Sequence, residues 1–223
     1  MKIVLLFVFS VISFFLSFSM VTFETKGLCL VLSITLFVWS SIERKMEKER
    51  INAEMKRKSE ELLQAIPHTQ FTLAPDYLSA LLLDERTNTV YVAYREELDS
   101  GFERKEYQFS EIFEAAIVED EDILSFSSTG GGSLLGGGGS SRDAEDDPDD
   151  DSEEVVSKLS IKMVVNDLTN PILEFVFMEN STHLSKETDQ YKEISKLCKQ
   201  WHQKISIIIK RYEKETVPIN RWN

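Results

Sequence analysis

Residues 186–214 read KETDQYKEISKLCKQWHQKISIIIKRYEK, and this stretch decides how the rest of the chain must be arranged. Its apolar residues recur at steps of three and four, which predicts an amphipathic helix with a wide apolar stripe. One β-hairpin is too small to cover such a stripe, so the helix requires a larger sheet. The stripe includes Tyr191, Ile194, Leu197, Cys198, Trp201, Ile205, Ile208 and Ile209.

Alternating apolar residues predict strands both before and after an insert at residues 127–158. After the insert, residues 157–167 and 172–180 predict a hairpin whose turn contains Asn170 and Pro171. Before the insert, four or five strands are expected within residues 77–85, 89–96, 103–109, 113–120 and 122–127.

The insert SSTGGGSLLGGGGSSRDAEDDPDDDSEEVVSK begins with glycine and serine and ends with acids. Glycine is conformationally free and neighbouring carboxylates repel one another, so a disordered loop is expected at residues 127–157. Neither group of strands makes a convincing unit alone. One soluble domain is therefore expected at residues 67–215, followed by a tail at residues 216–223.

Several strands, two or three further strands and a final amphipathic helix follow the element order of the pleckstrin-homology superfold. The passage Phe109-Ser110-Glu111-Ile112, which leads into the strand AAIVEDEDIL, resembles a passage in bacterial pleckstrin-homology-like (PH-like) domains. The resemblance covers Phe71 to Tyr212 and departs from the family in the very long acidic loop. It implies an α+β fold, with an antiparallel sheet or barrel closed by the C-terminal helix. It also implies a binding or assembly module without catalysis, of the kind that often accompanies membrane segments in Gram-positive and phage proteins.

The first 42 residues are almost entirely apolar and predict a transmembrane helical hairpin at residues 1–42. Residues 3–23 carry no charge and match the roughly 20 apolar residues that a span requires. Residues 27–42 are also uncharged, although they are short for a span. Basic residues crowd after Ile42 and only Lys26 lies in the outer turn, so the positive-inside rule places the following residues in the cytoplasm.

Two features of the first apolar segment allow two interpretations each. Ser17-Phe18-Ser19 is passable as a signal-peptide cleavage site, so residues 1–19 are either part of the hairpin or a cleaved leader. Ser13 and Ser17 either let two helices approach closely or bond back to their own helix.

Residues 43–66 lack Gly and Pro and predict a charged helical stalk that continues the second span and ends before Pro67. Opposite charges recur four residues apart, as in Glu54–Lys58 and Lys56–Glu60. The apolar positions do not sustain a heptad, so a solvated stalk is favoured over a coiled coil. Basic residues near the membrane are expected to reach anionic lipid headgroups, namely Arg44, Lys45 and Lys48.

The formal net charge is −13, which argues against nucleic-acid binding because phosphate contacts need a basic surface. Much of the acid lies in one run at residues 141–154. This run either attracts a basic protein partner or only keeps the domain soluble and away from the anionic membrane. The candidate partner-binding residues are Asp146, Asp147, Asp149, Asp150, Asp151, Glu153 and Glu154.

Catalytic, cofactor and metal sites are not predicted. The glycines lead into acids rather than into the Lys of a phosphate loop, and the acids lack EF-hand spacing. Cys198 and His202 supply two ligands where zinc needs three or four, so they are predicted as a core and a boundary residue. Trp201 is predicted as a core anchor, Glu119–Asp122 as a solvated turn, and Cys29 is not expected to bridge to Cys198.

These observations predict a membrane-anchored cytoplasmic binding or scaffold module that senses or regulates a membrane-associated protein. One alternative is a secreted or surface-displayed binding domain. A second alternative is a membrane-linked hydrolase whose catalytic residues the sequence does not identify.

Overall fold

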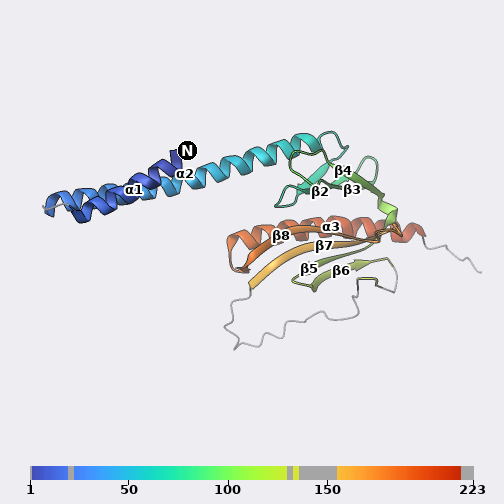
Figure 1. The fold of residues 1–223 in the computed structure, drawn as a ribbon. Helices are drawn as coiled ribbons and strands as arrows, with labels where there is room; N and C mark the ends of the chain where they lie inside the picture. Colours follow the sequence, from blue (N-terminus) through green and yellow to red (C-terminus); the bar gives the residue numbers. More distant parts are fainter. Residues whose placement is uncertain (1, 20–22, 130–132, 136–154, 217–223) are drawn as a thin grey trace, which may run out of the picture. The chain divides into compact units, whose positions relative to one another are not determined.

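The computed structural model describes the chain except residues 1, 20–22, 130–132, 136–154 and 217–223. The protein combines helices with two antiparallel sheets and divides into two compact units, Met1–Glu60 and Glu61–Asn223 (Figure 1). In chain order the elements are α1 (Lys2–Ser19), α2 (Phe23–Leu63), β1 (Gln70–Leu73), β2 (Ser79–Asp84), β3 (Thr89–Tyr94), β4 (Glu103–Gln108), the 3₁₀ turn η1 (Phe109–Glu111), β5 (Ile112–Glu119), β6 (Asp122–Ser128), β7 (Val155–Val165), β8 (Ile172–Ser185) and α3 (Asp189–Thr216).

Helices α1 and α2 are joined by hydrogen bonds between serine hydroxyls and backbone carbonyls. Ser10 Oγ donates to the Ser33 carbonyl and Ser33 Oγ donates to the Ser10 carbonyl, both at 3.0 Å. Ser13 Oγ donates to the Cys29 carbonyl at 3.1 Å, whereas Ser17 Oγ donates to a carbonyl of its own helix at 2.8 Å. Ser13 thus bonds to the neighbouring helix and Ser17 bonds back to its own helix, so each of the two interpretations given above applies to one serine.

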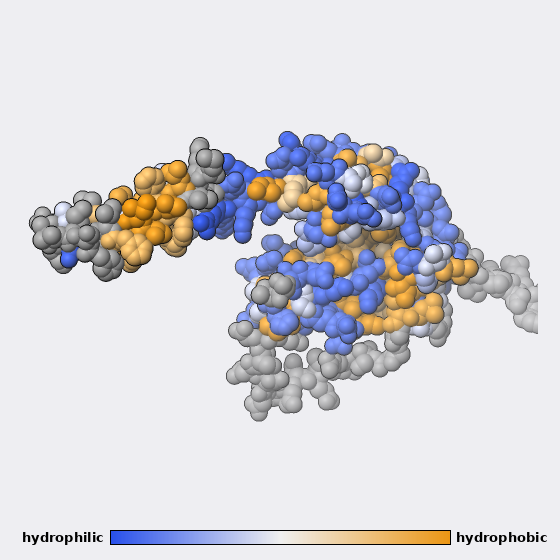
Figure 2. Space-filling view, in the orientation of Figure 1, coloured by the Kyte–Doolittle hydropathy of each residue, from blue (hydrophilic) through white to orange (hydrophobic). Residues whose placement is uncertain are grey.

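The N-terminal unit exposes many large apolar side chains. Figure 2 shows hydrophobic residues gathered along α1 and the apolar part of α2, and hydrophilic residues along the charged part of α2. Within the described residues, one segment, Thr25–Leu63, is long and apolar enough to cross a membrane. The exposed side chains include Leu5, Phe9, Phe15, Val31, Ile34, Phe37 and Trp39.

The second apolar segment and the charged stalk form one uninterrupted helix, because α2 runs from Phe23 to Leu63. It ends before Pro67, as predicted. Two of the predicted ion pairs form along it, Lys58–Glu54 at 3.2 Å and Lys56–Glu60 at 3.9 Å.

The first sheet has the strand order β1-β2-β3-β4, and its central hairpin joins the two strands predicted at residues 77–85 and 89–96. Strand β1 was not predicted. Both faces of this hairpin are buried. Leu81 and Val90 face the main core, whereas Leu82 and Ala93 pack with Leu63 and Ile66 from the end of α2 and the residues after it.

The second sheet has the strand order β6-β5-β7-β8, so β5 lies between β6 and β7. Asp120 and Glu121 form the turn between β5 and β6, and both have positive φ angles, 44° and 82°. Two consecutive residues of this kind suit a tight two-residue hairpin. The predicted hairpin after the insert is confirmed by the pairing of β7 with β8.

The connection from β6 to β7 is a crossover rather than a simple loop. Both strands are antiparallel to β5, so they run in the same direction on its two sides. Strand β6 ends at Ser128, which pairs with Glu114 of β5. In β7 the residue that pairs with Glu114 is Val164, nine residues after the first residue of the strand, Val155. The connecting chain therefore returns about 30 Å along the sheet. A parallel pair needs such a crossover of about a dozen residues or more.

The predicted loop at residues 127–157 was wrong at both ends. Residues 127 and 128 belong to β6, and residues 155–157 belong to β7. Ser127 and Ser128 pair with β5, and Val155 and Val156 pair with β8, so these residues at the ends of the insert gain sheet hydrogen bonds. The greater part of the expected disordered segment, 130–132 and 136–154, lies outside the described residues.

Helix α3 lies along the second sheet and closes the main core (Figure 1). Trp201 and Cys198 are buried, which confirms their predicted core positions. Leu197 is 39% exposed, so its place in the apolar stripe was wrong. His202 is 5% exposed and lies in the core rather than at its boundary. It tolerates burial because Nε2 lies 3.3 Å from the Ala115 carbonyl, which accepts a hydrogen bond from a neutral ring.

Candidate functional site

The first turn of α3 is fixed by a cap and by a buried carboxylate. The Tyr191 N–H donates to Thr188 Oγ1 at 3.3 Å, which satisfies one of the free amides of the helix start. The Tyr191 hydroxyl donates to Glu119 at the end of β5, and Lys186 pairs with the other oxygen of the same carboxylate, both at 2.5 Å. Residues from β5, the end of β8 and α3 thus meet at one point.

The environment of Tyr191 perturbs its ionisation. Burial, followed by the hydrogen bond to Glu119, raises the pKa of Tyr191 to about 12. Two turns further along the helix, burial raises the pKa of the Cys198 thiol to about 12, and one turn beyond Cys198 burial lowers the pKa of His202. The side chains of Cys198 and His202 are therefore both neutral at physiological pH, which suits a structural role rather than nucleophilic or acid–base chemistry.

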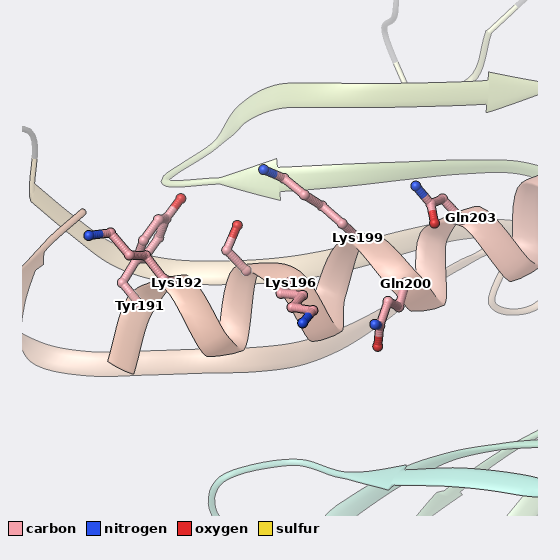
Figure 3. A pocket seen from close by; sticks show the side chains of 7 residues that line it. Tyr191, Lys192, Lys196, Lys199, Gln200 and Gln203 are labelled. Carbon is pink, nitrogen blue, oxygen red and sulfur yellow. The ribbon is translucent and has the colours of Figure 1, made fainter. Parts of the chain in front are cut away.

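A shallow pocket of about 440 Å³ lies along the outward face of α3, beginning at this first turn. Figure 3 shows its side chains projecting from successive turns of the helix. The lining residues are Tyr191, Lys192, Ser195, Lys196, Lys199, Gln200 and Gln203. We call the three exposed lysines of this group, Lys192, Lys196 and Lys199, the lysine strip.

The lysine strip is a concentrated positive charge on an acidic protein. Lys196 and Lys199 lie in a stretch of the helix, Ile194 to Tyr212, that carries five Lys or Arg residues and no acid, whereas Lys192 has Glu193 beside it in the sequence; the whole chain has a net charge of −13. Within the described residues, no carboxylate lies within ion-pair distance of the three lysines. The pocket therefore presents cationic groups beside the hydroxyl and amide groups of Ser195, Gln200 and Gln203.

A second buried carboxylate holds the described part of the insert. Glu114 on β5 is 4% exposed and accepts a hydrogen bond from the Leu134 N–H, at 3.0 Å to each carboxylate oxygen. Ser133 Oγ and the Leu135 N–H donate to the same carboxylate at 3.1 and 3.3 Å. Residues 133–135 are thus clamped to the second sheet.

The turn at Glu119–Asp122 is only partly the solvated turn that was predicted. Asp120 and Glu121 are exposed, but Glu119 is buried because Tyr191 and Lys186 bind it. Asp120 accepts hydrogen bonds from the Ser157 N–H, the Ser157 hydroxyl and the Lys158 N–H. Burial opposes ionisation of Asp120, but these hydrogen bonds prevail and hold its pKa below the usual value.

The predicted partner-binding acids from Asp146 to Glu154 lie outside the described residues. Cys29 and Cys198 are both free thiols. No group of three or more His, Cys, Asp or Glu side chains that could hold a metal ion occurs in the part of the chain that the structure describes.

Sequence reasoning missed the lysine strip and both buried glutamates. The strip had a readable signal, because Lys192, Lys196 and Lys199 follow one another at four and three residues on a predicted helix. Glu114 and Glu119 had no such signal in the sequence, since the residues that bind their carboxylates lie far away along the chain.

Comparisons with protein-family models, with curated proteins and with solved structures returned no match for this chain. The resemblance to PH-like domains therefore stays a prediction.

Proposed function

We propose that this protein is a membrane-anchored binding module that holds a folded α+β unit on the cytoplasmic side for a membrane-associated protein partner. Residues 3–42 serve as a two-helix anchor, and the face of α3 together with the acidic run offers the binding surfaces. The PH-like element order supports the same role.

The observation that carries this proposal is the continuity of α2. The helix begins in an apolar segment with exposed side chains such as Ile34 and Trp39, and it continues without a break to Leu63. Leu63 is fully buried in the core of the Glu61–Asn223 unit. A segment that favours a bilayer is thus covalently and helically continuous with the folded unit.

The serine hydrogen bonds between α1 and α2 support the two-helix anchor. Hydroxyls that donate to carbonyls of the neighbouring helix are satisfied without water, as the interior of a bilayer requires. Basic residues after Ile42 support the cytoplasmic orientation.

Protease protection in sealed cells tests the location. The chain carries a C-terminal epitope, and intact cells are treated with protease before and after permeabilisation. We expect the epitope and the acidic run to be protected until the membrane is opened. Digestion in intact cells would show a surface-displayed domain and would end the cytoplasmic assignment.

Affinity purification from membranes tests the binding role. The native chain is compared with a variant in which the acids from Asp146 to Glu154 are replaced by their amides, which keeps the length of the connection. We expect a specific protein partner with the native chain and a weaker one with the variant. Retention of the partner at equal strength would remove the acidic run from the binding surface.

A further inference from the structure

We propose that the lysine strip of α3 binds an acidic segment of the partner protein in an extended conformation. The inference rests on the proposed binding role and names the chemistry of the partner at one of its two surfaces. It differs from the sequence-based expectation, in which the acidic run recognises a basic partner.

The spacing of the lysines matches an extended acidic chain. Lys192 and Lys196 are separated by four residues of helix, or about 6 Å along the axis, and Lys199 follows about 4.5 Å further. In an extended peptide, alternate side chains lie on the same face and repeat at about 6.7 Å. Carboxylates at alternate positions can therefore meet successive lysines with small adjustments of the flexible lysine chains.

The shape of the site favours a peptide over a lipid surface. The lysines line a concave pocket of about 440 Å³, whereas a bilayer presents a surface that is flat on this scale. Figure 3 shows side-chain amides of Gln200 and Gln203 on the same stretch of helix, beyond Lys196. These amides can donate to and accept from a peptide backbone, which gives register as well as charge recognition.

The lysines are available for this contact. All three are exposed and, among the described residues, none is engaged by a carboxylate. Attraction between opposite charges in this position accelerates association and weakens with added salt. The strip would thus select acidic segments over neutral ones of the same length.

The test uses the full-length chain in detergent micelles and a fluorescent synthetic peptide of alternating Asp and Ser. The pocket variant replaces Lys192, Lys196 and Lys199 by Gln. The control variant makes the same change of charge elsewhere on α3, with Lys204, Lys210 and Arg211 replaced by Gln.

We expect the peptide to bind the native chain in a salt-dependent manner and the control variant within about twofold of it. The pocket variant should bind about tenfold more weakly, and the matching Asn and Ser peptide should not bind. If both variants bound the peptide equally weakly, binding would depend on the overall charge of the helix rather than on the lysine strip, and the proposal would be overturned.

Two further outcomes would also overturn it. The first is binding of phosphatidylserine vesicles, but not of the peptide, in a manner that depends on Lys192, Lys196 and Lys199. The second is peptide binding that appears only after the chain's own acids from Asp146 to Glu154 are neutralised, which would mean that the strip is occupied within the chain.

Failure here is distinguishable from failure of the proposed function. Loss of peptide binding with a protected C-terminal epitope would leave the anchored module intact and remove only this surface. An epitope that is digested in intact cells, with peptide binding retained, would remove the cytoplasmic assignment and leave this binding surface intact.

Discussion

Three carboxylates, on Glu114, Glu119 and Asp120, each tie a distant piece of chain to β5 or to the turn after it. Glu114 accepts from the Ser133 hydroxyl and the Leu134 and Leu135 N–H groups. Glu119 binds Tyr191 and Lys186, and Asp120 binds the start of β7. Glu114 and Glu119 are buried, and several donors replace water around each of them, so burial of the charge is compensated. Removing either buried carboxylate leaves donors without an acceptor, which is more costly than the hydrogen bond itself.

Replacing Glu114 by Ala is expected to lower the free energy of unfolding by about 1–3 kcal/mol, because three donors lose their acceptor. Equilibrium urea unfolding of the full chain measures this loss. Glu114→Gln keeps one acceptor oxygen and should lose less. Glu106→Ala on an exposed position of β4 is the control and should stay within about 0.5 kcal/mol of the native chain.

Replacing Tyr191 by Phe is expected to alter the alkaline stability profile. The native tyrosine keeps its proton up to about pH 12, whereas the unfolded one releases it near 10.0, its ordinary pKa. The native state therefore holds more protons between these values, and the free energy of unfolding falls as pH rises through this window.

Tyr191→Phe should show a shallower fall over that window, and a loss of about 1 kcal/mol at neutral pH from the missing hydrogen bond. Urea unfolding at a series of pH values measures both effects, with Tyr77→Phe as the control. An unchanged alkaline slope in Tyr191→Phe would contradict the role given to the Glu119 contact.

Local periodicity predicts elements well where one face meets a core. The three- and four-residue steps of residues 186–214 predicted α3, and alternation of apolar residues predicted β3, β7 and β8. Strand β1 was missed because its four residues, QFTL, are too few to show a period. The order of the second sheet was not predictable either, since no local pattern states which strand lies beside β5.

Among the side chains of α3, Trp201 is expected to contribute most to the packing of the helix against the sheets. It is 2% exposed, and Trp201→Ala should lower the free energy of unfolding by about 3–5 kcal/mol through lost burial and a cavity. Leu197→Ala, 39% exposed on the same helix, is the matched control and should cost about 1 kcal/mol or less. Similar losses in the two variants would contradict the orientation of α3.

The crossover sets a minimum length for the connection between β6 and β7. Removing residues 146–151 leaves 13 residues between Leu135 and Val155, enough to cover about 30 Å. Removing residues 140–154 leaves four, which reach at most about 18 Å. The short deletion should preserve the free energy of unfolding, whereas the long one should release the Glu114 clamp or the start of β7.

A double variant separates these two possibilities for the long deletion. If the clamp is released, adding Glu114→Ala should cause no further loss of stability. A stable protein with an intact clamp after the long deletion would contradict the crossover itself.

The whole molecule contains an apolar unit and a folded unit that share one helix. The sequence predicted an apolar anchor at residues 1–42, a charged stalk at residues 43–66 and a soluble domain from residue 67, whereas the two compact units divide between Glu60 and Glu61. It did not predict that the end of the stalk belongs to a core. Leu63 and Ile66 pack with Leu82, Tyr91 and Ala93, and only the folded chain brings these residues together.

A chain that begins at Glu61 is therefore expected to be more stable than one that begins at Pro67. The longer chain keeps Leu63 and Ile66, whose burial contributes about 3–6 kcal/mol together. Urea unfolding of the two truncated chains measures the difference, and a Glu61 chain with Leu63→Ala and Ile66→Ala should behave like the shorter one. Equal stability of the two truncated chains would contradict the packing of this segment.

The central place of β5 also bears on the order of events during folding. The pairs β5–β6 and β7–β8 each join neighbours in sequence, whereas Ile117 of β5 must find Ile161 of β7 across the connection. The two hairpins are therefore expected to form early, with their docking as the slow step. Because the entropy of closing a loop grows only logarithmically with its length, the acidic run can become longer with little effect on that step.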